Sequence, residues 1–320
     1  MATKTMNYTS KGIIGLLLEA LTNVIGARWV DRTSIYVDSD EETEHHAWMG
    51  GIPGMRERGE GSRLAKQVRD FNWSIRNKKF DATINVPLDL LRRDKTGQLQ
   101  SRINDLSIAG ERHWSSLLST LVEDGESSLC YDGQFFFDTD HSEGDSGTLS
   151  NDITTDISAI PANVHGVVAA PSPEEMKSAI FKSIKQLYTL KDDQGEFINQ
   201  DVTDFTVMVP MGLLEAAAEA LSGQFVGAGS ANLLTNLQID GNALNFDLVQ
   251  NPRLSWTDKF ATFVGGGQAL IRQEEVQPMA KSLAEGSDHE FNNDEWLFAI
   301  DTIRNAGYGR WQHAVLNTLT

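Results

Sequence analysis

Apolar residues recur at helical spacing between Gln98 and Glu123. The repeating positions are Leu99, Ile103, Leu106, Gly110, Trp114, Leu117 and Leu121. Steps of three and four residues place such side chains on one face of an α-helix. Thr96 is a candidate cap at its start, and Gly125 is placed to end it. At about 1.5 Å per residue this helix spans on the order of 40 Å, so the pattern predicts a long structural helix.

Three further stretches favour helices. Ser172-Pro173-Glu174-Glu175 is a strong helix start, with a capping Ser, Pro at the first helical position and acidic residues in the first turn. Residues 213–221 predict a short Ala-rich helix. Gly12–Ile25 is apolar on all sides, so we expect this N-terminal helix to contact another chain or a groove. No apolar run approaches the roughly 18 residues of a membrane span, so we expect no membrane partner.

Strand patterns are shorter and lie on both sides of the long helix. Phe135–Phe137 is predicted to be an aromatic strand between a Tyr131-Asp132-Gly133 turn and a polar exit at Asp138–His141. The other predicted strands are residues 33–37, 82–86, 206–210, 245–250, 260–264 and 269–272. The segment 145–274 therefore indicates a compact α+β unit with helices against a central sheet.

Residues 31–80 combine weak alternation with charge and glycine. An acidic limb, Asp38–Glu44, precedes a turn at Gly50–Gly54 and a basic return limb. The basic side chains are Arg56, Arg58, Arg63, Lys66, Arg69, Arg76, Lys78 and Lys79. Such a segment buries no core of its own, because an isolated two-stranded hairpin is marginal in water. Two interpretations stay open: a mobile surface loop, or an extended hairpin that lies across a neighbouring subunit.

Charge divides the chain into two halves. Residues 1–125 hold 17 Lys and Arg against 17 Asp and Glu, whereas residues 126–320 hold 10 against 28 and carry the whole net charge of -18. DNA binding uses Lys and Arg to replace the counterions of phosphates, so this chain is a poor candidate for coating nucleic acid. Solubility alone explains such a charge. The single cysteine, Cys130, excludes an internal disulfide and fits a reducing cytoplasm.

Candidate chemistry is sparse. Asp138, Asp140 and His141, followed by Glu143 and Asp145, are dense enough to bind a cation. Their order lacks the Gly and Glu spacing of a calcium-binding loop, so turn chemistry is favoured. Gly144–Gly147 repeats four letters found around a serine-protease nucleophile, but it follows a long helix and Thr148 replaces the usual next glycine. Gly265-Gly266-Gly267 lacks a following Lys-Ser/Thr and indicates a turn. We expect no enzyme, cofactor or metal site.

The Tyr131–His141 stretch carries a family resemblance. Tyr131-Asp132-Gly133-Gln134, an aromatic pair containing Phe136, and Asp138-Thr139-Asp140-His141 resemble a signature of the major head subunits of Mu-like tailed phages. The resemblance is strongest in Tyr131–His141, in Ser172–Pro210, in Trp256 with its flanking strands, and in the C-terminal stretch with Trp296, Gly309 and Trp311, and it is weakest in residues 31–95. The order of elements is similar to that of HK97-like capsid proteins.

This resemblance implies an α+β HK97-like fold and a division of the chain. The implied segments are an N-terminal arm (1–30), an extended hairpin loop, or E-loop, with flanking strands (31–95), a peripheral domain with the spine helix (96–144), an axial domain (145–274) and a return to the peripheral domain (275–320). No long helical scaffold segment precedes residue 31, so we expect either a separate scaffold protein or a processed chain.

The implied function is structural. As a major capsid protein, the chain would assemble as hexamers and pentamers into an icosahedral head in the cytoplasm of a bacterial host. The virion capsid would enclose double-stranded DNA without sequence-specific binding, and a scaffold protein and a portal would be its partners. The acidic half would suit a wall that repels packaged DNA. Two alternatives stay open: an encapsulin-like cellular compartment, and a metal-dependent hydrolase using Asp138, Asp140 and His141.

Overall fold

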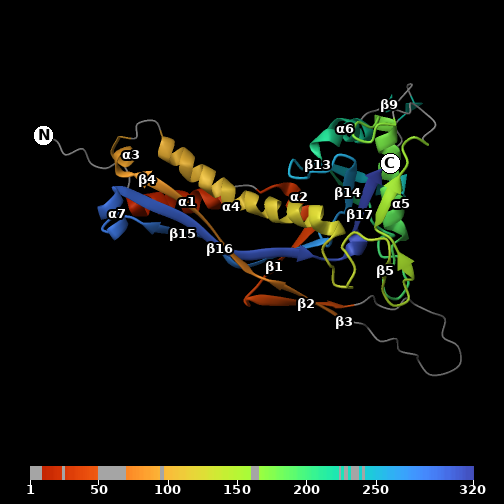
Figure 1. Cartoon of the computed structure of the whole chain (residues 1–320), viewed down its shortest axis with the longest axis horizontal. Coiled ribbons are helices and arrows are strands. Elements are labelled where there is room, and N and C mark those ends of the chain that lie inside the picture. Colours follow the sequence, from red (N-terminus) through yellow and green to blue (C-terminus); the bar gives the residue numbers. More distant parts are fainter. Residues whose placement is uncertain are drawn as a thin grey trace.

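The computed structural model describes residues 9–23, 26–49, 70–93, 97–159, 166–222, 225–226, 230–231, 238–239 and 242–320. They form an elongated part and a more compact part, joined end to end (Figure 1). In the elongated part, helices α1 (Ser10–Asn23) and α4 (Gln98–Glu123) pack against a long four-stranded sheet. The compact part holds a five-stranded sheet with α5 (Pro173–Thr189) and α6 (Leu214–Ser222). Helices and sheets in both parts confirm the predicted α+β class.

Helix α4 begins and ends where the apolar periodicity predicts, but the residues that cap it differ from the predicted ones. Its buried side chains are Leu99, Ile103, Leu106, Ser107, Trp114, Leu118, Ser119 and Val122. The N-cap is Gly97, whose φ of 73° is left-handed, and the predicted cap Thr96 lies outside the described residues. The helix gives way to a short 3₁₀ helix at Asp124–Glu126. Gly125 is buried there, and a Cβ on it would lie 2.5 Å from the ring of Phe137, so packing requires the glycine.

The four-stranded sheet has the order β1-β15-β16-β4. Its strands are β1 (Ser34–Asp38), β15 (Leu270–Leu283), β16 (Glu295–Tyr308) and β4 (Lys78–Pro87). β1 runs parallel to the start of β15, and the other pairs are antiparallel. β4 and β15 are longer than the predicted strands, because their outer halves alternate exposed and half-buried residues and carry little apolar signal. Three short helices border the sheet: α2 (Arg28–Thr33), α3 (Leu88–Arg93) and α7 (Asp288–Asn293).

Helix α1 packs within the chain. Ile13 and Leu17 are fully buried in a core with Leu99 and Ile103 of α4 and Trp296 of β16. We expected this helix to contact another chain or a groove. Its apolar face instead packs against α4 and the sheet of its own subunit. Leu18, on the opposite side of the helix, is 47% exposed. None of the described helices combines the length and apolar content that a membrane crossing requires.

A hairpin projects from the sheet below α4 (Figure 1). Strands β2 (Thr43–Met49) and β3 (Asp70–Arg76) pair antiparallel from Thr43↔Arg76 to Met49↔Asp70. The described ends of residues 31–80 are therefore paired as a hairpin. Its contact with a neighbouring subunit stays a prediction. The turn at residues 50–54 and the basic side chains of residues 56–69 lie outside the described residues. At the base of the hairpin, Arg76 binds Glu42 at 2.6 Å, so the two limbs attract each other.

The five-stranded sheet has the order β13-β8-β14-β17-β7. Its strands are β13 (Asn245–Gln250), β8 (Asp204–Val209), β14 (Lys259–Val264), β17 (Ala314–Leu319) and β7 (Asp152–Thr155). Helix α5 covers it and starts with the predicted capping box, in which Ser172 and Glu175 exchange hydrogen bonds. β17 belongs to the predicted C-terminal return, yet it lies in this sheet between β14 and β7. The chain therefore re-enters the compact part after β16.

Short two-stranded pairings complete the fold. They are β5 (His141–Ser142) with β6 (Thr148–Leu149), β9 (Phe225–Val226) with β10 (Ser230–Ala231), and β11 (Gln238–Ile239) with β12 (Asn242–Ala243). Two further 3₁₀ helices span Met211–Leu213 and Trp311–His313. The predicted strand at Phe135–Phe137 is wrong, because only Phe135 forms an isolated bridge, to Leu129. Gly265–Gly267 forms the expected turn between β14 and β15.

Candidate functional site

The stretch that carries the family resemblance lies between the end of α4 and the five-stranded sheet. Residues 127–151 form a loop here, and the turn at 309–313 packs on it. The predicted Asp-Gly turn is present: Gly133 has a φ of 87° and its N–H donates to the carbonyl of Cys130 at 3.1 Å. We call the polar side chains Tyr131, Asp132, His141, Glu143, Asn151, Trp311 and Gln312 the junction cluster.

His141 is the centre of one half of the junction cluster. Its Nδ1 lies 2.6 Å from the Asp132 carboxylate, and its Nε2 lies 3.2 Å from Oδ1 of Asn151. The Asn151 amide nitrogen donates to the carbonyls of Phe136 and Trp311, so the oxygen of that amide faces the histidine. Both ring nitrogens therefore lie against oxygen atoms, so Asp132 and Asn151 together fix the orientation of the imidazole ring. The histidine also stacks on the indole of Trp311 at 3.9 Å and 7°.

Glu143 is the centre of the other half. Its Oε1 accepts from the Tyr131 hydroxyl at 2.6 Å and from the indole N–H of Trp311 at 2.7 Å. The Tyr131 oxygen also lies 3.1 Å from Oε1 of Gln312. Burial raises the pKa of Glu143, although the two hydrogen bonds oppose that shift. Burial and the Glu143 charge also raise the pKa of Tyr131 well above its usual range, so the phenol stays a donor.

An apolar layer surrounds these polar groups. Phe136 and Phe137 are almost fully buried, and Phe136 stacks on Tyr308 at 4.6 Å. The Tyr308 hydroxyl donates to the carbonyl of Leu121 in α4 at 2.9 Å. Gly309 follows, where a Cβ would meet the carbonyl oxygen of Gln268 at 2.4 Å. Five of the seven members of the junction cluster are buried, so it is a closed polar cluster rather than an open site.

The remaining predicted residues are distributed differently. Asp138 accepts hydrogen bonds from the backbone N–H groups of Phe135 and Thr139, and Asp140 is exposed. The hydrogen bond and charge of Asp138 raise the pKa of Asp140. Trp256 is half-buried at the edge of the larger core, and Trp296 is fully buried in the smaller one. The structure therefore brings Tyr131, Asp132, His141 and Trp311 together but leaves Asp140, Trp256 and Trp296 apart.

The arrangement does not match the hydrolase alternative. His141 is fully buried with both nitrogens bound, and Asp140 points to solvent. Ser146 donates to the carbonyl of Gly147 and accepts from the N–H of Glu143, which is turn chemistry as expected. Among the residues that the structure describes, no group of three or more His, Cys, Asp or Glu side chains is placed to hold a metal ion.

Sequence reasoning missed Asn151 and Gln312 and gave Glu143 only a cation-binding interpretation. Asn151 lies ten residues from its partner His141, and Gln312 approaches Tyr131 from the far end of the chain. Neither contact has a local pattern, because each is made by folding of distant segments. Trp311 offered one general clue, since a buried indole N–H usually finds an acceptor, but the sequence does not identify Glu143 as that acceptor.

A second buried polar layer joins α4 to the four-stranded sheet. The Arg304 guanidinium is 1% exposed and lies 4.6 Å from the ring centre of Trp114. It donates from Nε to Nδ1 of His113 at 3.1 Å and from Nη2 to the carbonyl of Gly110. Glu274, hydrogen-bonded to Tyr36, lies 3.5 Å from the same guanidinium. The long helix is therefore fixed to the sheet by charge as well as by apolar packing.

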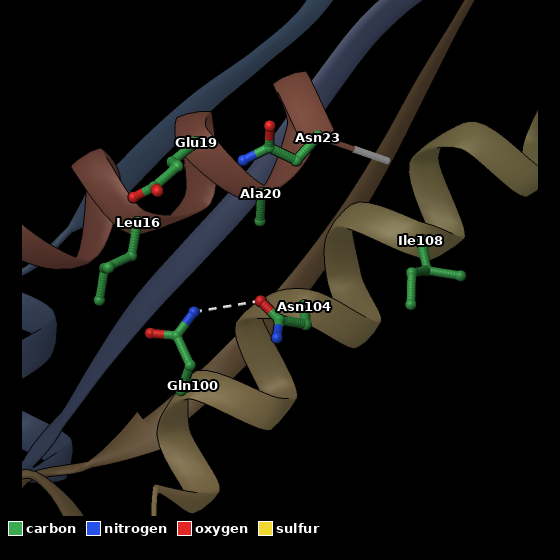
Figure 2. A pocket seen from close by; sticks show the side chains of 7 residues that line it. All are labelled: Leu16, Glu19, Ala20, Asn23, Gln100, Asn104 and Ile108. Atoms are coloured by element: carbon green, nitrogen blue, oxygen red, sulfur yellow. Dashed lines mark hydrogen bonds between the residues drawn. The ribbon is translucent and has the colours of Figure 1, made fainter. Parts of the chain in front are cut away.

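A groove lies between α1 and α4. It has a volume of about 490 Å³, and Figure 2 shows side chains from both helices around it. The lining residues are Leu16, Glu19, Ala20 and Asn23 of α1 and Gln100, Asn104 and Ile108 of α4. Gln100 donates to Asn104 at 3.1 Å along its wall. Four of its seven lining side chains are amides or a carboxylate, so this groove is predominantly polar.

Comparison with known proteins tests the family resemblance that the sequence suggested. Residues 20–160 match the family described as the Mu-like prophage major head subunit gpT. The matched segment contains the hairpin, α4 and most of the junction cluster. The resemblance stated on Tyr131–His141 is therefore confirmed. Residues 31–95 lie within the match, whereas Ser172–Pro210, Trp256 and the C-terminal aromatic stretch lie outside it.

Individual relatives agree with this match. The chain is 28% identical to the major capsid protein of Escherichia phage Mu over 111 residues, 35% of this chain and 36% of that protein. It is 32% identical to the Mu-like prophage FluMu major head subunit of Haemophilus influenzae over 108 residues, 34% of this chain and 35% of that protein. The matched segments thus span about a third of either relative.

The fold is similar over almost the whole chain to a solved capsid. The capsid structure of the cyanophage P-SCSP1u aligns with a TM-score of 0.55 and 12% identity, covering 93% of this chain and 91% of that one. At this identity the likeness concerns the fold alone. It confirms the predicted HK97-like capsid fold.

Proposed function

We propose that this chain, whose residues 20–160 match the Mu-like head-subunit family, is the major capsid subunit of a tailed-phage head. It is a structural protein that assembles as hexamers and pentamers into an icosahedral shell. The observation that carries the proposal is the coincidence of a sequence match to Mu-like head subunits with a capsid fold over nearly the full length.

Each part of the fold has a separate role in such a shell. The hairpin β2–β3 is the E-loop, α4 is the spine of the peripheral domain, and the five-stranded sheet is the core of the axial domain. The junction cluster ties the loop that follows the spine to the last turn before β17, and Tyr308, just before that turn, donates to Leu121 of the spine. These buried bonds would fix the angle between the two parts. A fixed angle suits a subunit whose copies must repeat over a closed surface.

The partners follow from this role. We propose a scaffold protein and a portal, assembly in the cytoplasm of a bacterial host, and enclosure of double-stranded DNA without sequence-specific contacts. The excess of Asp and Glu after residue 126 supports a wall that does not grip DNA, since phosphate binding needs Lys and Arg. The role is non-enzymatic, in keeping with the family that residues 20–160 match.

The encapsulin-like alternative shares the fold but differs in contents and in sequence relatives. Both sequence relatives named above are phage or prophage head proteins, which favours the phage head over a cellular compartment. The hydrolase alternative has no support from the arrangement of Asp138, Asp140 and His141.

The contents of the particles test the proposal. The chain is expressed together with the genes that flank its own, and particles are purified and treated with nuclease. The proposal predicts protected double-stranded DNA inside shells of this chain. Shells filled with an enzyme and no DNA would indicate the cellular compartment, and a small metal-bound oligomer would contradict both shell functions.

A further inference from the structure

The tip of the long β15–β16 hairpin carries an exposed aromatic side chain. Phe291 in α7 is 89% exposed, more than any other large apolar side chain in the described part of the chain. No residue of α7 is buried, so this helix serves no core of its own subunit. A Phe side chain left in water forgoes the favourable free energy that burial of its apolar surface would give. Such a residue marks a contact surface when the backbone holds it in place.

The backbone at this tip is held firmly. Ser287 caps α7 by accepting from the N–H of Glu290 at 3.2 Å, and the Glu290 carboxylate accepts from the N–H of Gly286 at 2.6 Å. His289 binds Glu295 at 3.1 Å across the end of the hairpin. Asp294 then leaves the helix in a left-handed conformation with φ 53°. These bonds hold Phe291 in solvent rather than letting it fold back on the sheet.

The tip is also acidic. Glu285, Asp288 and Asp294 are exposed around Phe291, and Glu290 is half-buried beside it. We call Phe291 with Glu285 and Asp288 the acidic tip. An aromatic anchor ringed by carboxylates fits a surface that offers an apolar hollow and positive charge.

The same chain presents such a surface at the base of the β2–β3 hairpin. A hollow of about 670 Å³ is lined by Arg76, Asn77, Lys78, Lys79, Ile303, Glu42 and Glu275. Arg76 is paired with Glu42, whereas Lys78 and Lys79 are exposed. Ile303 and the lysine stems supply apolar walls, and the two ammonium groups exceed the one remaining carboxylate.

One chain cannot bring these two surfaces together. The register pairs Pro87 of β4 with Glu295 beside α7, and Lys78 with Arg304 at the opposite end of the strand. At about 3.3 Å per residue, the tip and the lysines are roughly 30 Å apart along one continuous sheet. Figure 1 shows α7 at one end of that sheet and the β2–β3 hairpin well away from it.

We propose that the acidic tip of one copy docks on the hairpin base of a second copy, with Phe291 in the hollow beside Ile303 and the tip carboxylates on Lys78 and Lys79. Such a contact joins two different surfaces of identical chains, and repeated contacts of this kind close into rings when the rotation allows. The inference rests on the proposed shell function, because it names the contact by which copies join.

Assembly of variants of the full chain, each produced together with the genes that flank its own, tests this contact. Phe291→Ser is expected to lower the yield of shells at least tenfold, whereas Phe291→Leu and the neighbouring control Asn292→Ala assemble as the unchanged protein does. Because Phe291 has almost no contacts within its subunit, the Tm of the unassembled Phe291→Ser chain stays unchanged. Assembly of Phe291→Ser at the normal yield would overturn the proposal.

Charge exchange identifies the partner surface. Lys78→Glu with Lys79→Glu is expected to block assembly, as is Glu285→Lys with Asp288→Lys, and the four changes together are expected to restore it. If each pair blocks assembly and the combination does not restore it, the tip does not meet the hairpin base and the proposal is wrong. Failure of the unchanged chain to form any shell in the same assay would instead contradict the proposed function itself.

Discussion

At the scale of single residues, Glu143 shows how a buried charge is tolerated in the junction cluster. One carboxylate oxygen accepts from both Tyr131 and Trp311, so two buried donors depend on it. A group of this kind is costly to remove, because donors left without an acceptor in the interior lose their hydration as well. The arrangement ties the loop after β5 to the C-terminal turn.

Two substitutions of Glu143 separate hydrogen bonding from charge. Glu143→Gln keeps a carbonyl oxygen for both donors, so the free energy of unfolding is expected to change by less than about 1 kcal/mol. Glu143→Ala removes the acceptor and is expected to cost about 2–4 kcal/mol. Urea unfolding of the unassembled chain measures both values. Equal losses in the two variants would contradict the role assigned to the carboxylate oxygen.

The ionisation of Glu143 is expected to affect how the stability of the chain depends on pH. Burial raises the pKa of Glu143, so the folded chain holds a proton that the unfolded chain has already released. Stability is therefore expected to fall as the pH rises from the usual carboxyl range through the raised pKa. Glu143→Gln removes this titration, and its unfolding free energy is expected to vary less over that window. A profile identical to that of the unchanged chain would rule out the effect.

At the scale of elements, α4 is attached to the sheet by apolar packing and by the hydrogen bond from Arg304 to the neutral imidazole of His113. Burial, then the charges of Arg304 and Arg253, lower the pKa of His113 to about 4. The unfolded imidazole titrates at about 6.5, so it binds a proton before the folded one does. The stability contributed by neutral His113 is complete above that value and is lost as the pH falls towards 4.

His113→Asn tests this attachment. The amide oxygen can accept from Arg304 in place of Nδ1, but it does not titrate. We expect the loss of thermal stability between pH 6.5 and pH 4 to be smaller in the variant but not abolished, because His313, whose pKa is also lowered to about 4, still contributes. An unchanged pH profile would show that His113 does not contribute to acid lability.

Gly309 is tightly surrounded and Gly15 is not, so replacing each by alanine is expected to change the free energy of unfolding in opposite directions. In Gly309→Ala the new Cβ would meet backbone at 2.4 Å, and overpacking is expected to cost about 1–3 kcal/mol. Gly15, in the middle of α1, has no neighbour within 4 Å, so Gly15→Ala is expected to stabilise by about 0.5–1 kcal/mol. Thermal unfolding of both variants measures the shifts. A stabilised Gly309→Ala chain would refute the close approach of the last turn to residues 268–269.

The same elements show what sequence determines locally. The bounds of α4 and the capping box of α5 follow from periodicity and cap chemistry within one segment, and both predictions are confirmed. The strand at Phe135–Phe137 is not formed, because Phe136 and Phe137 are buried against Gly125 and Tyr308 from other segments, whereas Phe135 is exposed. The junction cluster was only partly predictable for the same reason. Its pairs join residues up to 181 positions apart.

At the scale of the whole molecule, the chain has an elongated shape with a polar joint between its two parts. The matched family segment ends in that joint, and the fold resembles a capsid chain on both sides of it. The strongest apolar feature outside the cores is at the far end of the sheet, on α7. This placement of buried joint and exposed tip suits a subunit that is completed by its neighbours.

Electron cryomicroscopy of the chain produced with its flanking genes tests the central claim most directly. We predict closed shells in which this fold repeats around five-fold and six-fold clusters, with α4 and the four-stranded sheet traceable in every subunit. A uniform population of monomers or small oligomers, with the flanking proteins present and no shells, tubes or rings, would contradict the account.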